Sequence, residues 1–171
     1  MSKDLGHIVI STDGGCRNNQ AKDKSQVIGG WGVVLNFFPP NKNNSPTPPP
    51  PTVKELWDGK KGYTSNNEME LTAILRALSA LKRYDIPTEI RTDSEYSVNV
   101  LTKWRWNWER NGWRNSKGQQ IANKELVIQV CNLYSKLENV KITWTKGHAS
   151  DAGNIRADAL ANMAMDKYSR E

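Results

Sequence analysis

The length, charge and cysteine content of the chain exclude several classes of protein. Its 171 residues suffice for one domain with a substantial core. It carries 24 Lys and Arg against 18 Asp and Glu, a net charge of +6, which is a modest excess that suits a polyanionic partner. Its two cysteines, Cys16 and Cys131, are too few for a disulfide scaffold and too far apart for a zinc motif, so a reduced, cytoplasmic compartment is expected. No apolar run approaches the roughly 20 residues of a membrane span, and no apolar signal region precedes the first predicted strand.

The first predicted element is a strand over residues 7–15 (HIVISTDGG), in which the side chains alternate with a period of two. Gly14 and Gly15 are expected to end this strand, which places Asp13 at its carboxyl end. Open α/β sheets hold their ligand sites at the carboxyl ends of the strands. The alternative is that Asp13 only starts a turn.

An antiparallel meander is predicted next. Residues 31–38 and 52–58 have the composition of strands, and the proline-rich residues 39–51 (PPNKNNSPTPPPP) separate them. Such a stretch can form neither a helix nor a strand ladder, so a stiff, polyproline-like loop is expected, on the far side of the molecule from the site.

A helix with a buried face follows the meander. Ser65 and Glu68 form the Ser-x-x-Glu pattern of a capping box, and Pro87 is expected to end the helix. Glu70 lies in the second turn, beside the apolar face. It is either a solvated residue on the flank or a residue that points over the sheet edge toward Asp13, and the spacing slightly favours the flank.

Residues 88–94 (TEIRTDS) repeat the pattern of the first strand and end at Asp93. If the two strands are parallel neighbours, their ends lie about 5 Å apart. Carboxylates that close repel each other unless a proton or a cation lies between them. Ser94 is predicted to cap a short helix over residues 95–101.

A segment rich in tryptophan and positive charge comes next, over residues 103–117 (KWRWNWERNGWRNSK). Its five basic residues and one Glu give a net charge of +4, and four tryptophans are interleaved with them. Trp104 and Trp108 are four residues apart and would share a helix face. At least two of the tryptophans are expected to anchor this protrusion to the core, while its charges face outward. A basic protrusion with aromatic residues is typical of proteins that bind a phosphate backbone.

The last elements are an amphipathic helix over residues 123–137, a strand over residues 140–145, and a glycine-flanked loop over residues 146–154 that carries His148. A histidine there suits proton transfer, although a surface histidine without a role is the commoner case. Asn154 is predicted to cap the final helix, with Asp158 in its first turns. The residues of that helix expected to face the core are Ile155, Leu160, Met163 and Ala164.

The order of the elements predicts an α/β domain with a mixed sheet covered on both faces. Right-handed crossovers would lay the fourth and fifth strands parallel to the first. Four acidic residues then stand where elements meet: Asp13, Glu70, Asp93 and Asp158. Hard oxygen ligands of this kind suit magnesium or manganese, and a pair of such ions can clamp the attacking and leaving oxygens of a phosphoryl displacement.

Six segments in this order carry a resemblance to a known family: TDGGC (12–16), TSNNEMEL (64–71), TDSEYSVN (92–99), WNWERNGW (106–113), KGHA (146–149) and NIRADALA (154–161). Over about residues 7–165 the chain resembles type 1 ribonuclease H of the bacterial kind. The resemblance implies a single α/β domain over residues 1–171, with a ribonuclease H-like, five-stranded mixed sheet in the order 3-2-1-4-5 and helices on both faces. It also implies an endoribonuclease that cleaves the RNA strand of RNA–DNA hybrids, leaves 5′-phosphate and 3′-hydroxyl ends, and removes RNA during replication and repair.

The resemblance also implies roles for individual residues. The carboxylates Asp13, Glu70, Asp93 and Asp158 match the family's catalytic metal ligands, for two Mg²⁺ ions or for Mn²⁺ in their place. His148 matches a catalytic histidine that assists proton transfer or product release. The positions that match substrate-binding residues are Gly14, Asn19, Asn66 and Asn67 in the minor groove, Ser65 in a phosphate pocket, and Trp104, Trp108, Arg110, Trp113 and Arg114 in the basic protrusion.

Three features depart from the bacterial pattern. Glu95 stands where Gln is usual, Glu109 dilutes the charge of the protrusion, and the proline-rich loop has no counterpart in the short bacterial enzymes. Whether that loop recruits a partner such as a single-strand-binding protein is left open; the chain is otherwise expected to be a monomer that binds an RNA–DNA hybrid and no membrane.

Two other functions compete with this one. The first is a catalytically silent hybrid-binding module, against which the four carboxylates argue. The second is a DNA-directed relative such as a resolvase or an integrase, against which the Asn pair and the protrusion argue.

Overall fold

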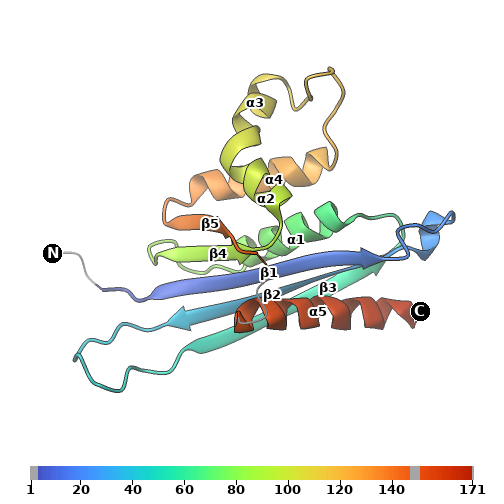
Figure 1. Cartoon of the computed structure of the whole chain (residues 1–171). Coiled ribbons are helices and arrows are strands. Elements are labelled where there is room, and N and C mark those ends of the chain that lie inside the picture. Colours follow the sequence, from blue (N-terminus) through green and yellow to red (C-terminus); the bar gives the residue numbers. More distant parts are fainter. Residues whose placement is uncertain (1–3, 147–150, 171) are drawn as a thin grey trace.

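The computed structural model describes residues 4–146 and 151–170, and its five strands form one mixed sheet in the order β3-β2-β1-β4-β5 (Figure 1). This confirms the predicted sheet order. β1 pairs antiparallel with β2 and parallel with β4. Of the outer pairs, β2–β3 is antiparallel and β4–β5 is parallel. The strands are β1 (His7–Arg17), β2 (Ile28–Phe38), β3 (Thr52–Lys61), β4 (Thr88–Thr92) and β5 (Val140–Trp144).

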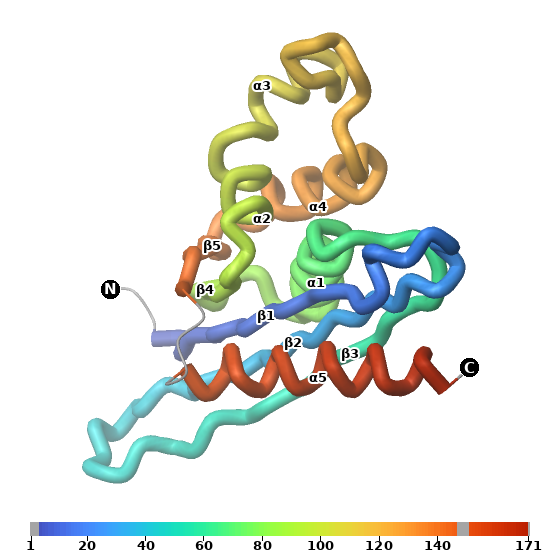
Figure 2. The backbone as a smooth tube through the Cα atoms, turned by 45° about the vertical axis from the view of Figure 1, so that its right-hand side comes forward, coloured from blue at the N-terminus to red at the C-terminus, as the bar shows by residue number. Residues whose placement is uncertain are grey.

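The helices lie on both faces of the sheet (Figures 1 and 2). α1 packs on β1 and β2 and contacts α4, whereas α5 packs on β1, β2 and β3 of the opposite face. The largest side chains of the core, such as Ile10, Ile74 and Ile90, are fully buried between the sheet and α1. The helices are α1 (Asn66–Ser79), α2 (Glu95–Asn99), α3 (Arg105–Arg110), α4 (Lys124–Lys136) and α5 (Ala152–Ser169), with a π-helical segment (Val100–Trp104) between α2 and α3 and a short 3-10 helix (Lys24–Gln26) before β2.

The start of α1 follows the predicted cap, but its end does not follow the prediction. The Ser65 hydroxyl accepts a hydrogen bond of 3.1 Å from the backbone N–H of Glu68. The Glu68 carboxylate accepts a hydrogen bond from the Thr64 hydroxyl and pairs with Lys60, so only half of the capping box forms. α1 ends at Ser79, well before Pro87, because the buried side chains of Leu81 and Ile86 turn the chain back over the end of the core.

Three further predictions were wrong: the end of β1, the cap of α5 and the buried face of α5. β1 runs through Gly14 and Gly15 to Arg17, because this stretch continues its ladder with β2. α5 is capped by Asp151 rather than by Asn154, since the Asp151 carboxylate accepts a hydrogen bond of 3.1 Å from the backbone N–H of Asn154. The residues Ile155 and Met163 of α5 do not face the core and are 50% and 40% exposed.

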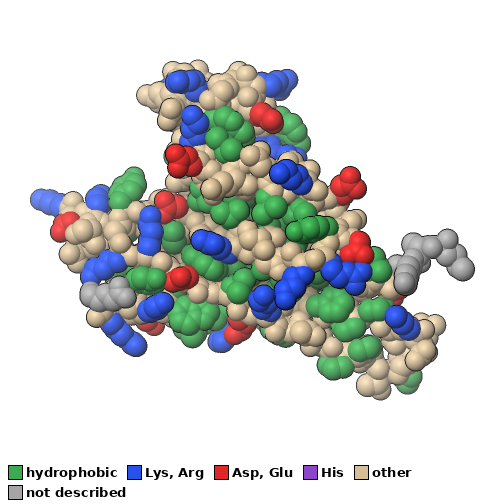
Figure 3. Space-filling view, turned by 180° about the vertical axis from the view of Figure 1, so that it is seen from behind, with side chains coloured by type: hydrophobic (Ala, Val, Ile, Leu, Met, Phe, Trp, Pro, Cys, Tyr) green, Lys and Arg blue, Asp and Glu red, His purple; other side chains and the backbone are tan. Residues whose placement is uncertain are grey.

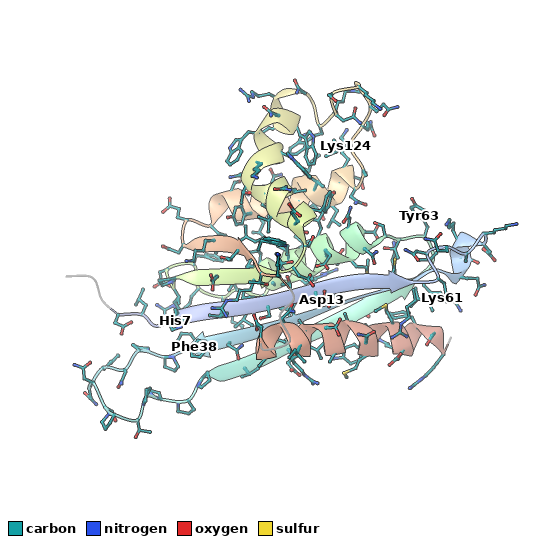
Figure 4. The ribbon with its side chains drawn as sticks, viewed as in Figure 1. His7, Asp13, Phe38, Lys61, Tyr63 and Lys124 are labelled. Atoms are coloured by element: carbon teal, nitrogen blue, oxygen red, sulfur yellow. The ribbon has the colours of Figure 1, made fainter. Side chains whose placement is uncertain are left out.

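The proline-rich loop leaves the sheet between Phe38 and Thr52, at the end where β1 begins. In Figure 4 the labelled His7 and Phe38 mark this end, away from Asp13. The Asn41 side chain both donates to and accepts from the backbone of Ser45, which fixes the first turn of the loop. Within the described residues, no helix is long and apolar enough to cross a membrane.

The approach of α5 to β2 depends on a missing side chain at Gly32. A Cβ atom at this position would lie 2.4 Å from the Ala157 carbonyl oxygen and 2.7 Å from Leu160 Cβ. We expect Gly32→Ala to lower the free energy of unfolding by about 2–3 kcal/mol, the usual cost of overpacking a core. Urea unfolding measures this, and Gly15→Ala is the control because its Cβ would meet only Asn66 Oδ1, at 3.6 Å. An unchanged midpoint for Gly32→Ala would mean that the helix lies farther from the sheet.

Candidate active site

The site forms where β4 ends and β1 continues. The last paired residues of this parallel ladder are Thr12 and Thr92, so from Asp13 onward β1 has no strand partner on that side among the described residues. Asp93 follows directly after β4 and lies at this step. Gly14 lets α1 approach the same point, because a Cβ there would lie 2.4 Å from the Met69 carbonyl carbon and 2.6 Å from the Glu70 nitrogen. Three elements therefore deliver one carboxylate each to the open edge of β1.

Three of the four predicted acids meet at this edge. Asp13, Glu70 and Asp93 each offer a carboxylate oxygen, and these oxygens lie within 4.8 Å of one another. Glu70 is only 8% exposed, and its Oε2 atom is buried without a hydrogen-bond partner among the described residues. The preference for a solvated flank position was therefore wrong for Glu70: its side chain points over the sheet edge, the alternative that the spacing had left open.

The fourth acid, Asp158, reaches the site from α5 on the opposite face of the sheet. It lies in the second turn of that helix and is exposed. Its carboxylate is close enough to Asp13 to raise the pKa of Asp13 through a side-chain hydrogen bond and through charge repulsion, and its charge also raises the pKa of Asp93. Asp13, labelled in Figure 4, thus has the carboxylate of Glu70 from α1 on one side of the sheet and that of Asp158 from α5 on the other.

Burial and the crowding of negative charge raise the pKa values of these groups. Burial, followed by the charges of Asp13 and Asp93, raises the pKa of Glu70 to about 10. Burial, followed by Asp158 and Asp93, raises the pKa of Asp13 to about 7. Burial is also the largest cause of the raised pKa of Asp93. In the absence of a cation, Glu70 is therefore protonated at neutral pH, which reduces the repulsion among the carboxylates.

This donor set fits a divalent metal ion. Carboxylate oxygens are the ligands that Mg²⁺ and Mn²⁺ prefer, and a buried carboxylate oxygen without a partner, such as Glu70 Oε2, is an acceptor left for a cation. Three to four carboxylates in one place repel one another, and a bound cation removes this repulsion. The predicted His148 lies outside the described residues.

Comparison with known proteins gives the same family as the sequence motifs. The family model described as RNase H matches residues 6–166. A curated protein named ribonuclease H from Ruthia magnifica is 38% identical over 165 residues, covering 96% of this chain and 99% of its own length. Another from Paracidovorax citrulli is 40% identical and covers 95% of this chain and 97% of its own length. The chain belongs to the ribonuclease H family.

Solved structures of the ribonuclease H family have the same architecture. The crystal structure of LC9-RNase H1, described as a type 1 RNase H with the type 2 active-site motif, aligns with a TM-score of 0.79 at 25% identity, over 98% of this chain and 75% of that chain. LC11-RNase H1, solved in complex with an RNA/DNA hybrid, aligns with a TM-score of 0.59 at 25% identity, over 94% of this chain and 97% of that chain.

In this ribonuclease H chain two of the predicted groove residues, Asn66 and Asn67, lie where α1 begins. Asn66 and Asn67 form its exposed first turn, next to Ser65. Asn66 Oδ1 accepts hydrogen bonds from the Cys16 backbone N–H at 2.9 Å and from the Cys16 thiol at 3.4 Å. This contact fixes β1 beyond Gly14 against α1. No local pattern predicts this contact, because the partners lie 50 residues apart.

Asn19 is the remaining predicted groove residue, and it lies apart from α1 in the exposed turn that follows β1. Its backbone carbonyl oxygen accepts a hydrogen bond of 3.1 Å from Lys24 Nζ.

The tryptophans of the protrusion divide into anchors and exposed residues. Trp108 and Trp113 pack against the core, as predicted for two of the four, while Trp104 and Trp106 are 37% and 48% exposed. The rings of Trp104 and Trp108 are 5.5 Å apart between centroids, so these two residues do share a face. Trp113 adopts a left-handed backbone (φ 63°), which its partly buried ring and the hydrogen bond from its N–H to the Trp108 carbonyl hold in place.

The charges of the protrusion do not all face outward. Arg105 donates to the Leu101 carbonyl and stacks over Trp106, so its guanidinium is partly buried. Arg110 and Arg114 are exposed, and Arg114 lines a pocket of about 420 Å³ together with Trp104 and Trp108. Figure 3 shows Lys and Arg side chains at the tip of the protrusion. The outward charge of this segment is therefore lower than its composition indicates.

Proposed function

We propose that this chain is an endoribonuclease that hydrolyses the RNA strand of RNA–DNA hybrids and leaves 5′-phosphate and 3′-hydroxyl ends. The observation that carries the proposal is the meeting of Asp13, Glu70 and Asp93 within 4.8 Å in a chain of the ribonuclease H family. The solved relative with an RNA/DNA hybrid supports the same substrate class. We further propose that residues 1–171 act as a single domain and a monomer, with removal of RNA in replication and repair as the role.

Asp13, Glu70, Asp93 and Asp158 would hold the metal, and we propose two Mg²⁺ ions with Mn²⁺ as a substitute. When bound, such a pair of ions polarises the scissile phosphate and stabilises charge on the attacking and leaving oxygens. The four carboxylates fix where the phosphate can lie, because they come from two strands and two helices that are packed against one sheet. We assign the movement of a proton at the attacking or leaving oxygen to His148.

Strand choice is proposed to depend on the start of α1. The 2′-hydroxyl of RNA is both a donor and an acceptor, and it is the group that distinguishes RNA from DNA in the minor groove. Asn66 Oδ1 is occupied by Cys16, so its Nδ2 group, which makes no hydrogen bond among the described residues, is the free donor. Asn67 is exposed beside it and offers both an acceptor and donors.

One assay separates this function from its competitors. The intact chain is mixed with an end-labelled RNA–DNA hybrid, with duplex DNA and with duplex RNA, each with Mg²⁺ and with a chelator. We expect cleavage of the RNA strand of the hybrid in Mg²⁺ alone. Binding of the hybrid without any cleavage would support a silent binding module, and cleavage of duplex DNA would support a DNA-directed relative.

The protrusion is proposed to contact phosphates, which gives affinity without base preference. We expect the double substitution Arg110→Gln with Arg114→Gln to weaken hybrid binding in chelator and to lower the slope of log affinity against log salt by about 2, roughly one for each lost phosphate contact. Binding titrations at several salt concentrations measure this slope. Lys82→Gln, an exposed lysine beyond the C-terminal end of α1, is the control. An unchanged slope in the double variant would place the DNA strand elsewhere.

A further inference from the structure

β1 and α5 lie side by side and run in the same direction (Figure 1). Asp13 and Arg17 are four residues apart in β1, so they lie on the same face of the sheet, about 13 Å apart. Asp158 and Asp166 are eight residues apart in α5, which spans about 12 Å. Because the two spacings match, Asp158 lies beside Asp13 and Asp166 lies beside Arg17.

Asn162 lies midway between these two pairs and connects them. Arg17 donates from Nη1 to Asp166 Oδ1 at 2.7 Å and from Nη2 to Asn162 Oδ1 at 3.0 Å. Asn162 Nδ2 in turn donates to the Asp158 carbonyl oxygen at 3.0 Å and to Asp158 Oδ2 at 3.4 Å. A chain of hydrogen bonds therefore runs from Arg17 through Asn162 to the fourth carboxylate of the site.

The arginine decides which way the amide of Asn162 faces. Guanidinium groups only donate, so Arg17 requires the Oδ1 end of the amide and leaves the Nδ2 end for Asp158. Without Arg17 the amide could turn and present an acceptor to the carboxylate, which would repel it. Asp158 needs such a restraint, because it is exposed and lies next to the carboxylate of Asp13.

We propose that Asn162 is a positioning residue, oriented by Arg17, that keeps the Asp158 carboxylate turned toward Asp13 so that a divalent cation meets the complete set of acids. This inference rests on the proposed metal-dependent function. Hydrogen-bond partners behind metal ligands commonly change metal affinity or activity tenfold to hundredfold. The link from Arg17 depends on the continuation of β1 as a strand four residues past Asp13.

The test compares Asn162→Leu with the unaltered chain in three measurements: calorimetric titration with Mn²⁺, cleavage of hybrid over a range of Mg²⁺ concentrations, and hybrid affinity in chelator. We expect Mn²⁺ affinity to fall about tenfold or more. We expect half-maximal cleavage to require correspondingly more Mg²⁺, with the rate recovering at saturation, and hybrid affinity in chelator to stay unchanged. Met163→Ala is the control, because this adjacent side chain lies about 100° around α5 from Asn162 and is 40% exposed.

A substitution pair distinguishes positioning from general damage. In an Asp158→Asn background, adding Asn162→Leu should change Mn²⁺ affinity less than twofold, because the group that Asn162 orients is already gone. Arg17→Gln should weaken Mn²⁺ binding in the same direction as Asn162→Leu while the far-UV spectrum stays native. Equal Mn²⁺ affinity for Asn162→Leu and the unaltered chain would overturn this inference. Failure of the unaltered chain to cleave hybrid with Mg²⁺ would instead overturn the proposed function.

Discussion

Asp93→Asn is expected to lower the rate of hybrid cleavage by at least about 10³-fold, since the loss of one charged ligand removes several kcal/mol of transition-state stabilisation. The fold should be unaffected, because Asp93 is exposed at the end of β4 and Asn keeps the shape of its side chain. The backbone carbonyl oxygen of Asp93, which accepts a hydrogen bond of 3.2 Å from Trp144 Nε1, is unchanged by the substitution. Hybrid affinity in chelator should stay within about threefold of the unaltered chain. Single-turnover cleavage of labelled hybrid and binding in chelator give the two numbers.

The matched control for this substitution is Asp85→Asn. Asp85 is also exposed but pairs with Arg83 in the turn before β4, away from the acid cluster. It should cleave at the unaltered rate. Wild-type cleavage by Asp93→Asn would show that the cluster at the end of β4 is not the catalytic centre.

Glu70→Gln is expected to have opposite effects on stability and on activity. In the metal-free protein the pKa of Glu70 is raised from 4.5 to about 10, so its contribution to stability is complete below pH 4.5 and is lost as the pH rises toward 10. Asp13 adds a similar loss between pH 3.8 and about 7. At pH 8 the substitution should therefore raise the free energy of unfolding, because Gln places no charge in the buried site and each unit of pKa shift expressed by that pH is worth about 1.4 kcal/mol. Near pH 4 the two proteins should be equally stable.

Urea unfolding in chelator at pH 4, 6 and 8 measures this effect. The same series with Mg²⁺ gives the second part of the prediction. An ion that binds only the folded state stabilises the protein, so the unaltered chain should gain stability from Mg²⁺. Glu70→Gln should gain much less, because it lacks one of the proposed ligands. Cleavage by Glu70→Gln should be lost. Lower stability of the variant at pH 8 in chelator would mean that the buried carboxylate is already neutralised by the protein.

Much of this site could be predicted from local pattern. Asp13 and Asp93 each end an alternating run of residues, and this pattern predicted that both lie at one edge of a parallel pair. The Ser65 and Ser94 caps could be predicted because a cap needs only neighbouring residues. The direction of the Glu70 side chain could not be predicted, because it depends on where β4 ends and on the close approach of α1 to Gly14.

The features that escaped prediction are set by contacts between distant segments. Two glycines usually end a strand, but β1 continues to Arg17 since β2 offers it partners. Arg105 looked like a surface charge, yet the aromatic ring of Trp106 and the Leu101 carbonyl hold it. The link from Arg17 to Asn162 needs the register of β1 against α5, which no local pattern encodes.

A crystal structure of the chain soaked with Mn²⁺, read from its anomalous density, tests the central claim most directly. We predict ions bound by the carboxylates of Asp13, Glu70 and Asp93, with Asp158 completing the site from α5. Density at other positions only, or an empty cluster at a Mn²⁺ concentration that supports hybrid cleavage, would contradict the assignment of these acids as the metal centre.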